Sequence, residues 1–282
     1  MFLSIIIVTY NRLAYLKRLL DILVEEIDKN PSLNIEIIIS DDGEITETRC
    51  ALDNYLSRVL LLQGEGKGPA ANRNNGALSA QGQWLLFLDD DVLPCKGFIR
   101  AYADVIEKYG REYLAFEGAI YPDDWSLLKK SNSECPININ GGAFWSANIC
   151  IERKLFFSIN GFDIRYKIAA NEDQDIYLQI KEVTNVLFVP SALVVHPVRF
   201  VPYLKLFTKY PEKLNNYILF VNKNFKKLGY KNKKNFLFKK IVEFLRGILH
   251  STRERKYLHV LYLVSTYIYS LPIFLLKVKC DE

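Results

Sequence analysis

Three consecutive carboxylates, Asp89, Asp90 and Asp91, follow the apolar run at residues 84–88. Carboxylates this close repel one another, so without a cation at least one of their pKa values should rise. A divalent metal removes that penalty, and Mg²⁺ or Mn²⁺ typically bridges carboxylates and substrate phosphates. The spacing of Asp89 and Asp91 lets both reach one ion. The alternative is an ordinary acidic turn or helix cap, since both are common.

A second acidic segment, Glu-Asp-Gln-Asp at residues 172–175, opens a predicted helix. Acids at a helix N-terminus are stabilised by the helix dipole and stay ionised. The same position suits a general base that takes a proton from a hydroxyl group. Asn171 can cap this helix, but capping explains one acid well and three poorly. The segment therefore favours a function.

Three other polar residues follow or open predicted elements. His196 ends an apolar strand 23 residues after Asp173, where it is either a further metal ligand or a structural histidine. Asp41, before Asp42 and Gly43, can accept a hydrogen bond from a nucleotide base, or the segment is an Asp-Gly turn with Asp42 as a helix cap. Arg73 follows small residues at a helix start, where a phosphate can approach, or it is a surface arginine.

The apolar patterns predict the elements that position these residues. Isoleucine- and leucine-rich runs predict strands, and apolar residues at helical spacing predict helices between them. The expected strands are residues 2–8, 35–39, 59–62 and 84–88, and the expected helices are 13–27, 46–56 and 69–79. This alternation predicts a three-layer α/β fold with a mostly parallel sheet, in which ligands collect at the carboxyl ends of strands. Residues 9–12, 41–43 and 89–91 all follow such strands and can converge on one crevice.

The second half of the chain is less regular. We expect strands at residues 115–120, 142–151, 186–189 and 192–195, and helices at 98–109, 153–159 and 172–181. From Pro202 onward the chain is expected to be mainly helical. We therefore expect a catalytic domain over residues 1–200 and a helical, basic and apolar region over residues 201–282.

Charge and cysteines limit the possible classes of protein. The 282 residues carry a net charge of +5, yet residues 201–256 alone hold 15 Lys/Arg against 3 Asp/Glu. Such a segment suits anionic partners or is a solvated helical face. The five cysteines include no C-x-x-C pair, which argues against a disulfide scaffold and fits a reducing compartment. Residues 1–8 lack the basic segment of a secretory signal.

Residues 257–276 contain no charged side chain and are long enough to span a bilayer. Tyrosines, hydroxyl residues and Pro272 dilute the segment, and basic residues flank both ends. This pattern favours a helix in the interface of an anionic membrane. Packing on the catalytic domain and a true span are the alternatives.

The chain resembles the family 2 inverting glycosyltransferases of the GT-A fold over about residues 2–200. Each matching motif is modest, but their order and spacing together are specific. The matching stretches are residues 4–12, 40–43, 72–76, 87–94, 160–163 and 171–175. One departure is Glu44, which stands where the family usually has serine, at a capping position.

The resemblance implies roles for individual residues. It implies Asp173 as the catalytic base, and a Mn²⁺ or Mg²⁺ site at Asp91, Asp89 and His196. Whether Asp89 or Asp90 accompanies Asp91 stays open. The donor nucleotide would meet Thr9, Tyr10, Asn11, Arg12, Asp41, Arg73, Asp89 and Asp90. The sugar and acceptor pocket would include Gly142, Trp145, Asp163 and Glu172.

The implied reaction moves a sugar from a nucleotide-sugar donor, by family habit a UDP-sugar, to a saccharide or lipid-linked saccharide. The implied setting is surface-polysaccharide or glycan synthesis, in the cytoplasm on the inner face of the cell membrane. The basic region shows no nucleic-acid-binding motif, so no nucleic-acid partner is expected.

Two alternatives belong to other classes. A sugar-phosphate nucleotidyltransferase would need a glycine-rich phosphate loop after the first strand, where residues 9–12 stand instead. An inactive partner subunit of a polysaccharide-assembly complex would not need the intact acidic triple or the pair Glu172 and Asp173.

Overall fold

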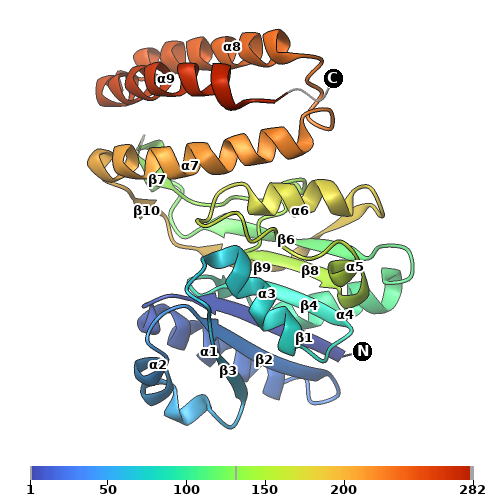
Figure 1. Ribbon diagram of the computed structural model, residues 1–282. Helices are drawn as coiled ribbons and strands as arrows, with labels where there is room; N and C mark the ends of the chain where they lie inside the picture. The colour runs from blue at the N-terminus through green and yellow to red at the C-terminus, as the bar shows by residue number, and fades with distance from the viewer. Residues whose placement is uncertain (1, 131, 280–282) are drawn as a thin grey trace. The chain divides into compact units, whose positions relative to one another are not determined.

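The computed structural model describes residues 2–130 and 132–279 (Figure 1). The described residues form two compact units. One consists of the chain up to Asp124 together with Cys135–Pro197, and the other of Trp125–Glu134 together with the chain from Val198 onward. The sequence placed a division near residue 200 but gave no sign that residues 125–134 belong with the helical end of the chain.

The first unit contains an eight-stranded sheet in the order β3-β2-β1-β4-β8-β6-β9-β5. Its strands are β1 Phe2–Thr9, β2 Asn34–Asp41, β3 Val59–Gln63, β4 Trp84–Asp89, β5 Leu93–Pro94, β6 Ala115–Pro122, β8 Asn148–Glu152 and β9 Val186–His196. The strands β1 to β4 are parallel, as predicted, and β6 is parallel to β9. The strand β8 runs antiparallel to both of its neighbours, β4 and β6.

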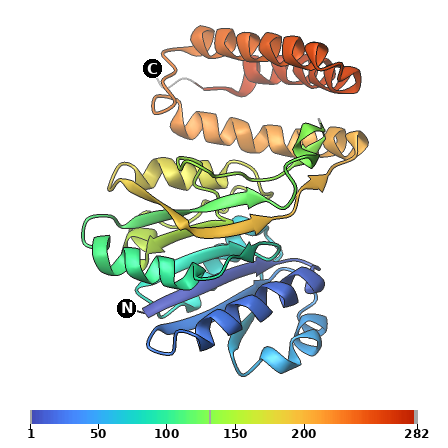
Figure 2. The same cartoon turned by 180° about the vertical axis from the view of Figure 1, so that it is seen from behind.

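Helices cover both faces of the sheet. On one face, α1 (Leu13–Asp28) and α4 (Phe98–Tyr109) lie together (Figure 2). On the other, α3 (Pro69–Ser79) packs on β1 and β2, and α5 (Arg153–Ser158) packs on β8. Ile5 belongs to the core shared with α1. Ile6 faces α3 so closely that a Cβ on Gly76 would lie 2.6 Å from its Cγ2 atom. Both faces of β1 are therefore buried, which explains its unbroken apolar sequence.

Register sets the carboxyl ends of the parallel strands beside one another. Thr9 pairs with Asp41, and Val8 pairs with Asp89. The polar residues that follow these strands consequently lie at one edge of the sheet, as the sequence indicated.

Some element boundaries differ from the predicted ones. The strand predicted at 142–151 begins only at Asn148, because residues before it form a loop in which Gly142 and Phe144 have positive φ values of 89° and 46°. The two strands predicted at 186–189 and 192–195 form one strand, β9, with a register shift opposite Gly118 and Ala119.

The helix predicted at 46–56 is also shorter than expected. It divides into α2 (Ile45–Ala51) and a 3₁₀ turn at Asp53–Tyr55. Glu44 caps α2 by accepting a hydrogen bond from the Thr46 N–H at 3.2 Å, so the residue that departs from the family pattern still serves as a cap. The other helix near the site is α6 (Glu172–Ile180).

The second unit is mainly helical, as predicted. Its elements are η2 Leu127–Lys129, β7 Ser133–Glu134, β10 Arg199–Phe200, α7 Tyr203–Asn224, α8 Lys233–Arg253 and α9 Tyr257–Lys277. Its buried core includes Leu214, Val221, Phe236 and Phe274. By length and composition α9 could cross a membrane, and 17% of its most apolar window is buried.

Candidate functional site

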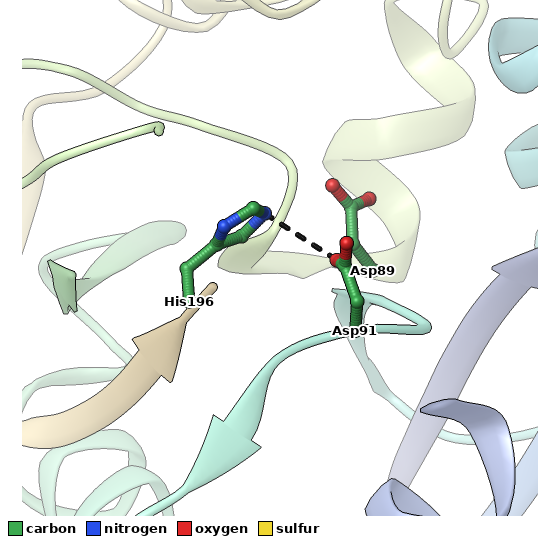
Figure 3. A group of neighbouring side chains, drawn as sticks. All are labelled: Asp89, Asp91 and His196. Atoms are coloured by element: carbon green, nitrogen blue, oxygen red, sulfur yellow. Dashed lines mark ion pairs between the residues drawn. The ribbon is translucent and has the colours of Figure 1, made fainter. Parts of the chain in front are cut away.

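Two aspartates and a histidine meet at the carboxyl edge of the sheet. Asp89, Asp91 and His196 each offer one ligand atom, and these atoms lie within 4.8 Å of one another (Figure 3). Asp89 ends β4, whereas His196 ends β9. The short strand β5, which the sequence did not predict, pairs Leu93 with Val195 and so brings the turn after β4 to the end of β9.

The histidine faces Asp91 with a ring nitrogen suited to a metal. His196 Nδ1 lies 2.9 Å from the Pro197 carbonyl oxygen, to which it donates a hydrogen bond. In the neutral ring, Nε2 then turns its lone pair toward Asp91 Oδ1 at 3.3 Å. Burial lowers the pKa of His196, although Asp89 and the Pro197 carbonyl oppose this. One imidazole with two carboxylates fits Mn²⁺ or Mg²⁺.

Asp90 is not part of this group and has other partners. Its Oδ2 atom accepts the Thr9 hydroxyl at 2.8 Å, and its Oδ1 atom accepts Arg12 at 3.0 Å. Burial raises the pKa of Asp90, whereas Arg12 and Thr9 lower it. Arg12 also reaches Asp91 Oδ2 at 3.2 Å. In this geometry Asp89, and not Asp90, accompanies Asp91.

The segment after β2 holds its own turn and the neighbouring glycine loop. Asp41 is buried, and its carboxylate accepts the Gly43 N–H at 2.7 Å and the Thr48 hydroxyl. Asp42 accepts the N–H groups of Gly66 and Gly68, each at 3.1 Å. Both carboxylates therefore stabilise loops at the carboxyl edge of the sheet.

The two residues between Thr9 and Arg12 lie at the surface. The side chain of Tyr10 is 63% exposed. Asn11 has a positive φ of 54°, and its side-chain oxygen lies 2.4 Å from the position that a Cβ on Gly43 would occupy. Glycine at position 43 thus allows the loop after β1 and the loop after β2 to approach each other.

Arg73 joins the acidic end of β4 to α6. Its buried guanidinium donates to Asp89 at 2.9 Å and to Glu172 at 3.3 Å. Burial alone would lower its pKa, but Asp89, Asp173 and Glu172 together raise it well above the ordinary value. Arg73 is therefore a permanent cation among three carboxylates, not a surface arginine. It also lies over the Phe162 ring, 5.5 Å from the centroid.

The first two acids of α6 have perturbed pKa values. Burial raises the pKa of Glu172 to about 7, and the charge of Asp173 adds to this while Arg73 opposes it. Burial also raises the pKa of Asp173, against Arg73 and hydrogen bonds from Ser146. Among the residues that the structure describes, no hydrogen-bond donor reaches Asp173 Oδ1, which is buried. A carboxylate with a raised pKa and an available oxygen is suited to accept a proton.

A loop held by Glu117 precedes Ser146. The buried Glu117 carboxylate accepts the N–H groups of Gly142 at 2.5 Å and Phe144 at 2.8 Å, and the Asn138 amide at 3.0 Å. These bonds explain why residues 142–147 form a loop and not the predicted start of a strand. Neither Glu117 nor Ser146 was expected from the sequence to contribute to the site. A signal for Glu117 existed, since it is a charged residue inside the apolar strand pattern of residues 115–120.

Trp145 and Asp163 have local partners. Trp145 donates its indole N–H to the Ile137 carbonyl at 3.1 Å and packs against the core. Asp163 pairs with Arg165 at 2.6 Å. The preceding residue, Phe162, exchanges backbone hydrogen bonds with the Asn74 amide at 3.0 and 2.7 Å. The turn at residues 160–163 is thereby fixed to α3 and places Phe162 beneath Arg73.

Similar proteins agree with this architecture. A Campylobacter jejuni protein, GalNAc(5)-diNAcBac-PP-undecaprenol beta-1,3-glucosyltransferase, is 31% identical over 146 residues, which are 45% of this chain and 46% of the relative. The chain thus spans less than half of that relative. Two solved structures share the fold. The Pyrobaculum calidifontis mannosyltransferase PcManGT, with GDP-Man and Mn²⁺, has a TM-score of 0.58 and 16% identity. The match covers 95% of this chain and 74% of PcManGT. Staphylococcus aureus TarS 1–349, with UDP-GlcNAc, has a TM-score of 0.57 and 16% identity. The match covers 96% of this chain and 92% of TarS 1–349.

The family model described as glycosyl transferase family 2 matches residues 4–170. This range is more than half of the 282 residues and contains most of β1, the strands β2 to β8, Arg73 and the acidic triple. The family that the motifs suggested is therefore matched by a family model, and the fold is shared with solved structures. The chain belongs to glycosyl transferase family 2.

Proposed function

We propose that this chain transfers a sugar from a nucleoside-diphosphate sugar to an acceptor hydroxyl, with inversion at the anomeric carbon. The observation that carries the proposal is that Arg73 connects the candidate metal group with the helix that bears the candidate base. This buried cation touches Asp89 of the candidate metal group and Glu172 beside the candidate base, Asp173. A donor diphosphate and an acceptor hydroxyl can thus be held within one site.

The residues Asp89, Asp91 and His196 would hold Mn²⁺ or Mg²⁺. Bound there, the ion would offset the charge that develops on the departing nucleoside diphosphate. The closeness of these three side chains supports this assignment, because their ligand atoms lie within 4.8 Å of one another.

The donor nucleotide would lie along the loops after β1 and β2. Thr9, Tyr10, Asn11, Arg12 and Asp41 would surround the base and ribose, with Asp90 holding Thr9 and Arg12 in place. Uracil is the base that we propose. UDP-GlcNAc is bound in one structural neighbour, and GDP-Man in another.

Asp173 would act as the general base. As the acceptor oxygen attacks the anomeric carbon, its proton passes to the Asp173 carboxylate, and the bond from the anomeric carbon to the diphosphate oxygen breaks on the opposite face. Ser146 would orient the carboxylate, leaving Oδ1 for the proton. Gly142, Trp145, Asp163 and Glu172 would border the sugar and acceptor pocket. Trp145 would act by supporting the loop that carries Ser146.

The acceptor would be a saccharide or a lipid-linked saccharide used in surface polysaccharide or glycan synthesis. The name of the Campylobacter relative supports this choice, because it specifies an undecaprenol-linked saccharide. On this proposal the protein works in the cytoplasm at the inner face of the cell membrane.

A thermal-shift screen of nucleotide sugars, with and without Mn²⁺, tests the donor assignment. We expect stabilisation by one UDP-sugar only when Mn²⁺ is present. Donor hydrolysis without acceptor then distinguishes an active enzyme from an inactive partner subunit. Release of inorganic diphosphate from a nucleoside triphosphate and a sugar phosphate would instead identify a nucleotidyltransferase and overturn the proposal.

A further inference from the structure

One face of α9 exposes a stripe of large apolar side chains. Leu258, Leu261, Ile268 and Leu275 have exposed fractions of 66%, 64%, 67% and 50%. Their spacings of three, seven and seven residues place them on one side of the helix. The stripe lies within the uncharged segment 257–276. Water therefore meets an apolar surface about 25 Å long, at 1.5 Å per residue.

The opposite face of α9 holds it in the helical unit. Thr266, Ser270 and Phe274 are buried there. Tyr267 stacks on Phe244 of α8 with the ring centroids 4.0 Å apart. Tyr262 meets aromatic side chains of α7, including Phe207 at 5.2 Å. A spanning α9 would lose these contacts, so the arrangement favours a helix that offers one face only.

Positive charge surrounds the stripe. Exposed Arg253 and Arg255 precede α9, exposed Lys277 ends it, and exposed Lys279 follows it. Residues 201–256 carry 15 Lys/Arg against 3 Asp/Glu. An apolar strip with cationic ends is complementary to an anionic lipid surface. A second copy of the chain would bring the same positive charge and be repelled.

We propose that the outward face of α9, defined by Leu258, Leu261, Ile268 and Leu275, docks on an anionic lipid bilayer. The helix lies along the interface, its leucines enter the acyl boundary, and its basic ends contact lipid phosphates. The α8 helix runs beside α9 (Figures 1 and 2) and also exposes large apolar side chains, Leu245 and Leu249. The inference rests on the second unit and not on the proposed transfer reaction.

Vesicle sedimentation of the full chain tests the proposal without any donor sugar. The protein should bind vesicles that contain phosphatidylglycerol, bind pure phosphatidylcholine more weakly, and be released by salt. The double variant Leu261→Glu/Ile268→Glu should weaken binding at least about tenfold, since each change removes a leucine-sized apolar group from the contact. The matched control Leu78→Glu/Val183→Glu alters residues of the first unit that are 69% and 59% exposed, and should bind normally.

A second variant keeps the test informative if the first fails to fold. Arg253→Gln, Arg255→Gln, Lys277→Gln and Lys279→Gln leave the apolar stripe intact and should weaken binding about fivefold for each charge lost. Binding that ignores both variants would overturn the proposal. So would resistance to alkaline extraction, which indicates a span. If the protein instead binds no vesicles but forms a dimer, and Leu261→Glu/Ile268→Glu dissociates that dimer, the face of α9 is occupied by a second copy of the chain.

Discussion

The guanidinium of Arg73 lies 2.9 Å from the Asp89 carboxylate and places a buried cation at the end of β4. The same group reaches Glu172 at 3.3 Å on α6. Arg73 therefore neutralises part of an acidic cluster that would otherwise oppose folding. It also fixes the distance between the candidate metal ligands and the candidate base, so several predictions depend on it.

Replacing Arg73 should destabilise the fold. Arg73→Met leaves Asp89, Glu172 and Asp173 without their buried cation, and we expect a loss of about 3–5 kcal/mol in the free energy of unfolding. Denaturant unfolding measures it. The double variant Arg73→Met/Glu172→Gln should recover part of the loss, because one unpaired charge is removed. An unchanged midpoint in Arg73→Met would show that the cation is not needed.

Asp173→Asn should abolish most turnover while leaving donor binding intact. A positioned general base contributes about 10²–10⁴ in rate, and asparagine cannot take the proton. Steady-state kinetics and donor titration measure the two effects separately. Asp104→Asn, on the exposed side of α4, is the control and should behave as wild type. Near-normal turnover in Asp173→Asn would remove Asp173 from the mechanism.

Asp91→Ala should abolish metal-dependent donor binding. Asp91 and His196 face each other at 3.3 Å, and loss of the carboxylate leaves the ion without one of its ligands. Isothermal calorimetry with UDP-sugar, with and without Mn²⁺, is the measurement. Asp90→Asn is the control variant at the neighbouring position. Because Asp90 binds Thr9 and Arg12, its variant should retain the response to Mn²⁺. Equal donor affinity in Asp91→Ala and wild type would contradict the assignment.

Stability of the metal-free protein should depend on the ionisation of Glu172. Its pKa rises from the ordinary 4.5 to about 7, so the folded state holds the proton more tightly than the unfolded state. Protonated Glu172 therefore contributes about 3 kcal/mol to the free energy of unfolding below pH 4.5. This contribution is lost as pH rises toward 7. Relative to wild type, Glu172→Gln should become more stable between pH 5 and pH 8. Parallel pH profiles for the two proteins would refute this.

Glu117 should be needed to keep the loop before Ser146 ordered. Glu117→Ala leaves the N–H groups of Gly142 and Phe144 without their acceptor, at a cost of about 1–3 kcal/mol for the buried Phe144. Amide hydrogen exchange at residues 142–146 should accelerate, and turnover should fall because Ser146 orients Asp173. Glu117→Gln keeps one acceptor oxygen and should restore part of the protection. Unaltered exchange in Glu117→Ala would show that the loop is held by other contacts, such as the Gln174 amide on Ala143.

Local patterns in the sequence determined the strands and helices around the site. The apolar run of β1 indicated a strand buried on both faces, and Ile5 and Ile6 confirm it by packing on opposite helical layers. Strand ends then placed Thr9, Asp41 and Asp89 at one edge of the sheet. These predictions succeed because burial and periodicity act over neighbouring residues, where a single chain segment carries the whole signal.

Contacts between distant segments were decided only by the tertiary structure. The pairing of β5 with β9 brings Asp91 to His196, 105 positions later in the chain, and selects Asp89 over Asp90 as its companion. The burial of Arg73 and the loop on Glu117 likewise depend on segments that meet only after folding. A two-residue strand such as β5 has no periodicity to read, and a polar side chain does not show in its own sequence which partner will compensate its burial.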